Sequence, residues 1–145
     1  MEKRSDNKSQ THKATYYDQF KLQLKPKIEE KEEYKLESLI PKAWKNDCYY
    51  LFKHERKIQK HHLEVSDEKK FTPLHIAVKC GYAEFARLLL KLGADPNAQN
   101  IEGNTALHLA FMENNLDMAK LLLRYNAQPG VLNIDNKSAI YYVDR

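Results

Sequence analysis

Two stretches in the second half of the chain carry apolar residues at the spacing of one helical face. The positions are Phe85, Leu88, Leu89 and Leu92 in the first stretch, and Leu116, Ala119, Leu122 and Leu123 in the second. Residues that recur three and four positions apart line one side of a helix. This half of the chain is therefore predicted to be helical, with each helix burying one face.

The start of the chain is more polar and predicts less structure. Residues 1–20 hold few aliphatic side chains, so they are expected to be disordered when alone. Apolar and polar residues then alternate over 20–25. This alternation fits either a short strand that adds to a partner's sheet edge, or a disordered arm in which the alternation is accidental.

Three helices are predicted in the segment that follows this arm. A charge-dense run of good helix formers extends from 27 to 40, and Pro41 is expected to interrupt it. The pattern beyond the proline predicts a second helix around 42–47 and a third around 49–63.

An internal repeat is the strongest feature of the sequence. The residues TPLHIA at 72–77 recur 33 positions later as TALHLA at 105–110. The residues RLLLK at 87–91 recur at the same offset as KLLLR at 120–124. A third copy begins with SAIYYV at 138–143. Self-similarity at one fixed period indicates an array of stacked structural repeats.

These motifs closely resemble the ankyrin-repeat family, whose T-P-L-H-x-A opening and G-A-x-P-N finger entry are both present. The resemblance implies an all-α short solenoid in which each repeat has a β-turn finger and two antiparallel helices. It places the first helices at 73–80 and 106–113, and the second helices at 83–91 and 116–124. The implied organisation is a charged N-terminal extension (1–37), a diverged helical cap (38–70) and repeats at 71–103, 104–136 and, truncated, 137–145.

The residue types at the repeat boundaries agree with this assignment. Thr72 and Thr105 suit helix N-caps, and a left-handed residue such as Gly103 is expected in each finger. Lys70 and Asn136 take the place of Gly103 in the neighbouring fingers, where Lys70 is unfavourable. For the diverged cap, residues 43–48 align with the segment that starts at Ala77, so that Ala43 matches Ala77.

The third copy stops before its second helix, which bears on the end of the stack. We expect the apolar side chains of Met118, Leu121 and Leu122 to be poorly covered there. Either a partner covers this face, or the tyrosine-rich segment at 141–143 shields it.

Composition and charge indicate where in the cell the protein is expected to be found. The chain has 145 residues, a formal net charge of +4 and a mean hydropathy of −0.74. It holds no apolar run long enough to span a membrane and does not begin like a secretory signal. Cys48 and Cys80 read as free thiols. An intracellular and cytoplasmic location is expected, with an organelle or a cytoskeletal assembly left open.

The candidate chemical groups do not form a recognisable catalytic, cofactor or metal site. The resemblance implies that His75 and His108 bond to the threonine that opens their helix. The neighbours His61 and His62 cannot face the same side of a helix, so a zinc site is disfavoured. Glycine-rich phosphate loops are absent from the sequence. We therefore expect a protein that is not an enzyme and has no cofactor.

A basic stripe is the one charged feature that favours a specific ligand. On a single helix Lys53, Arg56, Lys57 and Lys60 would share one face. Such a stripe is either a solvated surface or a contact for an acidic protein tail, nucleic acid or a lipid headgroup. Nucleic acid is disfavoured, because arginine is sparse and no aromatic platform accompanies the stripe.

The expected function is protein–protein interaction, as an adaptor or small structural subunit of a multi-subunit complex. The alternatives are a regulatory inhibitor that occludes a partner through its concave face, and a binder of nucleic acid or anionic lipid. The resemblance implies partner contacts at the finger tips and the concave helix surface. The candidate positions are Phe71, Lys79, Cys80, Ile101, Glu102, Asn104, Met112, Glu113 and Lys137.

Overall fold

The computed structural model describes residues 36–143. The predicted arm, the alternation over 20–25 and most of the helix from 27 to 40 lie outside the described residues. The described elements are α2 (Leu39–Trp44), α3 (Cys48–His54), α4 (Lys60–Leu63), α5 (Pro73–Cys80), α6 (Ala83–Lys91), α7 (Ala106–Met112), α8 (Leu116–Arg124) and a short 3-10 helix, η1 (Ala139–Tyr142).

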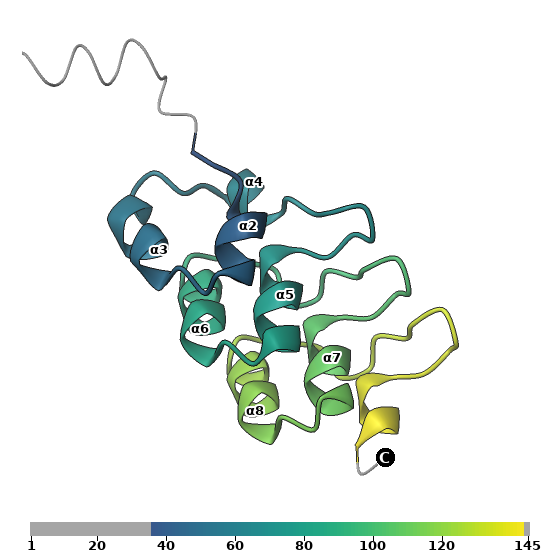
Figure 1. The fold of residues 1–145 in the computed structure, drawn as a ribbon. Coiled ribbons are helices and arrows are strands. Elements are labelled where there is room, and N and C mark those ends of the chain that lie inside the picture. Colours follow the sequence, from purple (N-terminus) through teal and green to yellow (C-terminus); the bar gives the residue numbers. More distant parts are fainter. Residues whose placement is uncertain (1–35, 144–145) are drawn as a thin grey trace, which may run out of the picture. The chain divides into compact units, whose positions relative to one another are not determined.

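The helices form two layers, and a row of projecting loops extends beyond one of them (Figure 1). The first layer, which we call the inner layer, contains α2, α5, α7 and η1, and the outer layer contains α3, α6 and α8. The projecting loops are the fingers, with tips at residues 67–71, 100–104 and 133–137. The predicted all-α repeat stack is confirmed.

The repeat helices begin where their capping residues predict. The hydroxyl oxygens of Thr72 and Thr105 accept hydrogen bonds from the third backbone N–H of α5 and α7, at 3.3 and 3.4 Å. Gly81 ends α5 in the left-handed conformation with φ of 77°, and Asn114 takes the same role after α7 with φ of 55°. The predicted bounds of α5, α6 and α8 are confirmed, and α7 ends one residue early at Met112.

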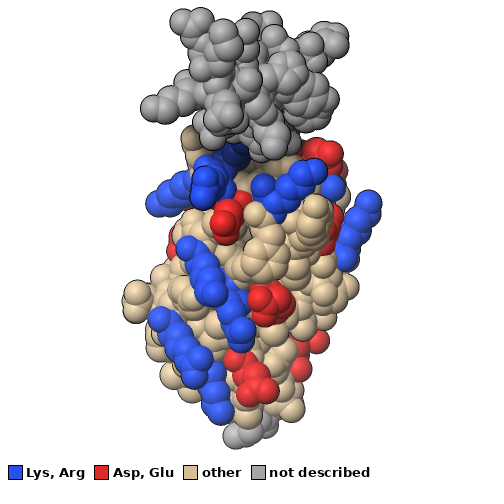
Figure 2. Space-filling model, turned by 90° about the vertical axis from the view of Figure 1, so that its left-hand side faces the viewer, with Lys and Arg blue, Asp and Glu red and all other residues tan. Residues whose placement is uncertain are grey.

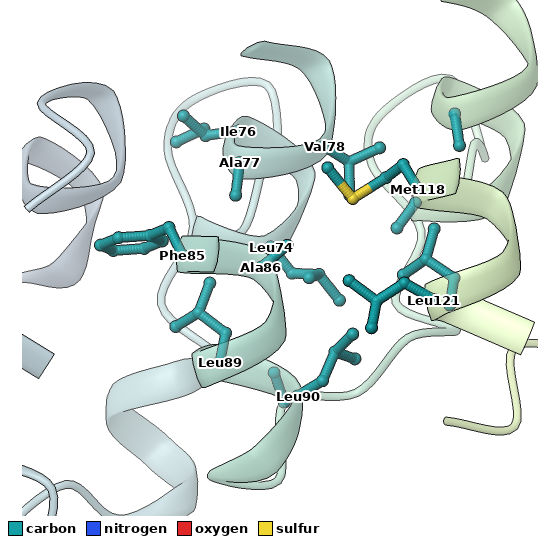
Figure 3. Packing of buried hydrophobic residues seen from close by; sticks show 14 of the residues in the cluster. Leu74, Ile76, Ala77, Val78, Phe85, Ala86, Leu89, Leu90, Met118 and Leu121 are labelled. Carbon is teal, nitrogen blue, oxygen red and sulfur yellow. The ribbon is translucent and has the colours of Figure 1, made fainter. Parts of the chain in front are cut away.

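The core lies between the two layers and continues from repeat to repeat. Phe85, Leu89 and Leu122 are completely buried. Figure 3 shows Val78 and Leu90 of one repeat facing α8 of the next. Each repeat thus buries its apolar face against its neighbour, as a solenoid requires.

Two expectations for the first half were wrong. Pro41 does not interrupt a helix but lies in the first turn of α2, which Ser38 caps. Backbone N–H groups in a first turn have no acceptor within the helix, so proline costs little there. The predicted helix over 49–63 is broken into α3 and α4. The turn between them buries Ile58, which is 9% exposed.

The alignment of the diverged cap was wrong by one residue. Asn46 is left-handed with φ of 54°, and its N–H donates to the Ala43 carbonyl at 3.1 Å. Gly81 makes the same bond to Val78 at 3.1 Å, so Ala43 corresponds to Val78 and not to Ala77. In this register α2 is an inner-layer helix and α3 its outer-layer partner.

The prediction that three apolar side chains of α8 are poorly covered was also wrong. Met118, Leu121 and Leu122 are only 1%, 8% and 0% exposed. They are covered because they face the preceding repeat and the inner layer, as Figure 3 shows for Met118 and Leu121. The side chains left open at this end are different ones.

Candidate functional site

The fingers are built from one hydrogen-bond pattern that recurs every 33 residues. The N–H of Asp67 donates to the Phe71 carbonyl, and the same bond joins 100 to 104 and 133 to 137, at 3.0–3.1 Å. Lys70, Gly103 and Asn136 are left-handed at the matching position, with φ of 62°, 76° and 62°. The predicted finger positions are therefore confirmed, including the strained Lys70.

Neighbouring fingers are tied together by their backbones. The Ile101 N–H donates to the Lys69 carbonyl, and the Ile134 N–H donates to the Glu102 carbonyl, each at 3.0 Å. The amide of Asn133 adds a side-chain bond to Asn104 at 2.9 Å. The finger tips therefore form a fixed row, which holds any exposed side chain on it in a defined place.

The two repeat histidines are structural. His75 Nδ1 accepts the Thr72 N–H at 3.0 Å, and its Nε2 lies 2.9 Å from the Ala98 carbonyl, to which it donates. His108 makes the matching bonds to Thr105 and Lys137 at 3.1 and 3.0 Å. Burial holds the pKa of His75 below its ordinary value. Both imidazoles are buried and already use both ring nitrogens, so neither is placed as a catalytic base.

An aromatic hollow lies between the first finger and the inner layer. Its volume is about 430 Å³, and its walls include Trp44, Phe71, Lys79 and the finger residues 67–69. The side chain of Trp44 is 50% exposed. Phe71 is less exposed than Trp44, and its ring makes an edge contact with the His75 ring. The Lys79 ammonium lies 5.2 Å from the centre of the Phe71 ring. The hollow therefore offers an aromatic wall beside a cation.

Among the remaining predicted contact residues, some are exposed and one already contacts another side chain of the same chain. Ile101 on the middle finger is 58% exposed and Met112 at the end of α7 is 39% exposed. Their neighbours Glu102 and Glu113 are exposed as well. The Lys137 ammonium lies 4.2 Å from the centre of the Tyr141 ring, so it is partly engaged within the chain.

Two of the predicted contact residues are not well placed for a partner. Asn104 is 3% exposed, and its side-chain oxygen accepts the bond from Asn133. Cys80 is half-buried, and burial raises the pKa of its thiol. Cys48 is free as well, and burial raises its pKa too. A raised pKa leaves less of the reactive thiolate at neutral pH.

Trp44 lines the aromatic hollow but was not among the predicted contact residues. In the observed register it corresponds to Lys79 of the next repeat and Met112 of the one after, at the exposed end of the inner-layer helix. The one-residue error had matched Trp44 with Val78, which is completely buried. A left-handed asparagine at 46, matched with Gly81, was the signal that would have set the register.

The predicted basic stripe does not lie on a single helix. Lys53 is in α3, Lys60 is in α4, and Arg56 and Lys57 lie in the turn between them. All four are exposed, and Lys60 pairs with Glu64 at 3.8 Å. The alternative of a nucleic-acid or lipid binder therefore loses the single-face geometry on which it depended.

Charges on the outer layer follow the helices. Figure 2 shows this side of the molecule, with Lys and Arg gathered beside Asp and Glu. The helices α6 and α8 each carry an acid in the first turn, Glu84 and Asp117, and a base in the last turn, Lys91 and Arg124. These signs complement the helix dipole, so helix stability accounts for them without a ligand.

Metal-ligand clusters and membrane-spanning helices are both absent from the described part of the chain. Within residues 36–143 no three metal-ligating side chains come together. None of the helices in this range is long and apolar enough to cross a bilayer.

Stacked helix pairs, a fixed finger row and an exposed apolar surface define a helical-repeat protein of the kind that binds other proteins. The family described as ankyrin repeats (3 copies) matches residues 12–100 and 42–133. The chain belongs to the ankyrin-repeat family, and the predicted resemblance is confirmed. Its repeats are protein–protein interaction modules, which points to a binding role and not to catalysis.

Curated proteins similar to this chain match it over short stretches. Human protein phosphatase 1 regulatory subunit 27 is 53% identical over 38 residues, which are 26% of this chain and 25% of that protein. Human ankyrin repeat domain-containing protein 13A is 39% identical over 61 residues, 42% of this chain and 10% of that protein. Delta-latroinsectotoxin-Lt1a of Latrodectus tredecimguttatus is 48% identical over 42 residues, 29% and 4% of the two chains. This chain thus spans a quarter or less of each of these relatives.

Proposed function

We propose that this chain is an adaptor or small structural subunit that holds a protein partner against its finger tips and inner-layer helices. The observation that supports this most is the aromatic hollow beside the first finger. A half-exposed tryptophan, Trp44, lines it together with Phe71. Tryptophan and other aromatic side chains dominate the binding energy of protein interfaces, especially where they enter or line a pocket.

The rest of the surface supports a contact that extends along the stack. Ile101 and Met112 are exposed apolar side chains on the next finger and the next inner-layer helix. The backbone bonds between fingers hold Ile101 in place, so little conformational entropy is lost when a partner packs on it. Exposed acids beside each apolar position, Glu102 and Glu113, supply a polar rim.

The test compares two double variants of the full chain by quantitative affinity capture. Ile101→Asp with Met112→Asp is expected to reduce the captured partner at least about tenfold, since a buried charge replaces each apolar contact. Tyr49→Asp with Phe52→Asp is the matched control, because both side chains are exposed apolar residues of α3 in the outer layer. Equal capture by the two variants would refute the proposed surface.

The role within a complex is tested by removing residues 1–35, which leaves every described residue in place. A structural subunit that holds its partner on the finger surface, and is itself anchored in the complex by its N-terminal segment, is expected to leave the complex when this segment is deleted. A regulatory inhibitor that works through the concave face is expected to remain bound. Native gel analysis of the complex separates the two roles.

The inhibitor role is the second candidate, and the name of one relative favours it. The relative that is 53% identical over 38 residues is a regulatory subunit of protein phosphatase 1. The purified catalytic subunit of that phosphatase is therefore a defined first probe. Binding that lowers its activity, and that the Ile101→Asp and Met112→Asp pair removes, would favour the inhibitor over the adaptor.

A further inference from the structure

Two apolar positions change from buried to exposed between consecutive repeats. Leu90 of α6 is 4% exposed, whereas Leu123, its counterpart 33 residues later in α8, is 44% exposed. Leu107 of α7 is 0% exposed, whereas its counterpart Ile140 in η1 is 60% exposed. Helix α8 lies beside Leu90 and packs on α7, which carries Leu107, whereas within residues 36–143 no further outer-layer helix follows to cover Leu123 and Ile140.

The inner layer shows the same change at a third position. Val78 at the end of α5 is completely buried, and its counterpart Phe111 in α7 is only half-buried. Figure 3 shows what covers the first of these copies, because Met118 lies beside Val78 and Leu121 beside Leu90. Both covering residues come from the outer-layer helix of the next repeat. At these two positions the covering side chains therefore come from one helix, α8.

Beyond α7 and α8 the described stack continues in one layer only. The 3-10 helix η1 packs on α7 and continues the inner layer, with Ala139 completely buried. Its Tyr142 hydroxyl accepts a bond from the Asn133 amide at 2.7 Å. Within residues 36–143 no helix follows α8 in the outer layer. The expectation that the tyrosine-rich segment shields the end therefore holds for the inner layer and not for the outer one.

We propose that Phe111, Leu123 and Ile140 form a docking site for one amphipathic helix of a partner protein. This helix lies where the outer-layer helix of a further repeat would lie. The stacking interface between α6 and α8 continues into this site by the same 33-residue step, which is why a helix is the occupant. The docked helix presents apolar side chains at positions i, i+3 and i+4, the spacing of Met118, Leu121 and Leu122 in α8.

This site is separate from the concave surface of the proposed function. The docking site lies where the outer layer would continue past α8, and residues of α7, α8 and η1 contribute to it. Ile101 and Met112 lie elsewhere, on a finger tip and at the exposed end of α7. The proposal does not depend on that function, and either can fail without the other.

The experiment measures binding of a helical peptide to the full 145-residue chain by fluorescence anisotropy. The probe is a labelled peptide with the sequence of residues 113–129. A hydrocarbon cross-link joins its positions 120 and 124, which lie on the exposed side of α8, so helix formation does not limit binding. A peptide of the same composition in scrambled order, with the same cross-link, tests whether the apolar spacing is needed.

The expected result is saturable binding that depends on the open end. Leu123→Glu with Ile140→Glu is expected to weaken binding at least about tenfold, and Ile101→Glu with Met112→Glu by less than about twofold. Leu123→Ser with Ile140→Ser is a milder pair that is also expected to weaken binding. It replaces the glutamate pair in the experiment if the glutamate pair does not fold. Circular dichroism checks that each variant keeps its helices.

Three outcomes would overturn the proposal. The first is no saturable binding of the cross-linked peptide, and the second is equal binding of the scrambled peptide. The third is self-association of the chain in sedimentation that Leu123→Glu with Ile140→Glu abolishes, because a second copy would then be the occupant of this face.

Discussion

Replacing His108 by alanine tests whether buried polar bonds hold the last finger. The imidazole is completely buried, accepts the Thr105 N–H at 3.1 Å and donates to the Lys137 carbonyl at 3.0 Å. Thr105 opens α7, and Lys137 closes the third finger. One side chain therefore joins two elements that are 32 residues apart in sequence.

The size of the effect follows from the two partners that lose their bonds. A buried donor or acceptor left without a partner costs about 1–3 kcal/mol. Thr105 is completely buried and Lys137 is half-buried, so water can reach only the second site. We expect the free energy of unfolding to fall by about 2–4 kcal/mol in total. The free energy of unfolding of a native domain is about 5–15 kcal/mol, so this loss is a large share of the total stability.

The assay is urea unfolding followed by circular dichroism, with His61→Ala as the matched control. His61 is exposed, so its replacement is expected to cost less than about 0.5 kcal/mol. Amide hydrogen exchange adds a local readout, because the third finger should lose protection before the first one. A loss below about 1 kcal/mol for His108→Ala, or uniform exchange across the fingers, would refute this reasoning.

Two further predictions concern pH and glycine. Because burial holds the pKa of His75 below its ordinary value, the unfolded chain takes up a proton at higher pH than the folded chain. The contribution of His75 to the free energy of unfolding is thus expected to be fully present above about pH 6.5. It should fall as the pH drops toward the pKa of His75 in the folded chain. Urea unfolding at several pH values measures this, and a His75→Gln variant should flatten the slope. For glycine, Gly103→Ala should destabilise more than Gly81→Ala. Their φ angles are 76° and 77°, but a Cβ at 103 would lie 2.9 Å from the Asn133 backbone. Equal thermal midpoints would contradict that prediction.

The sequence predicted those parts of the fold that depend on local signals. Helices α5, α6 and α8 begin and end as expected, because Thr72, Gly81 and the apolar spacing act within a few residues. The finger positions followed in the same way from the 33-residue repeat. The left-handed Lys70 was expected from the same repeat, although a lysine is unfavourable there.

The failures lie where tertiary contacts or register decided the outcome. The chain leaves the helical path after His54 to bury Ile58 and Leu63, which no periodicity in 49–63 revealed. The error of one residue at Ala43 hid Trp44, since a helix rotates its side chains by about 100° per residue. Of the candidate site, the exposed Ile101 and Met112 were predicted, but the aromatic hollow was not.

The end of the stack relies on polar bonds where apolar contacts are missing. In a repeat array each repeat is stabilised only by its neighbours. Within residues 36–143 no repeat helix follows η1, so the third finger and η1 contact a neighbouring repeat on one side. Here the Asn133 amide bonds to both Asn104 and the Tyr142 hydroxyl, and His108 bonds to Lys137. These directional bonds fix the third finger and η1 while Leu123 and Ile140 stay exposed. A surface that is apolar but rigid loses little conformational entropy when a helix docks on it, which is why this half-covered end suits a binding site.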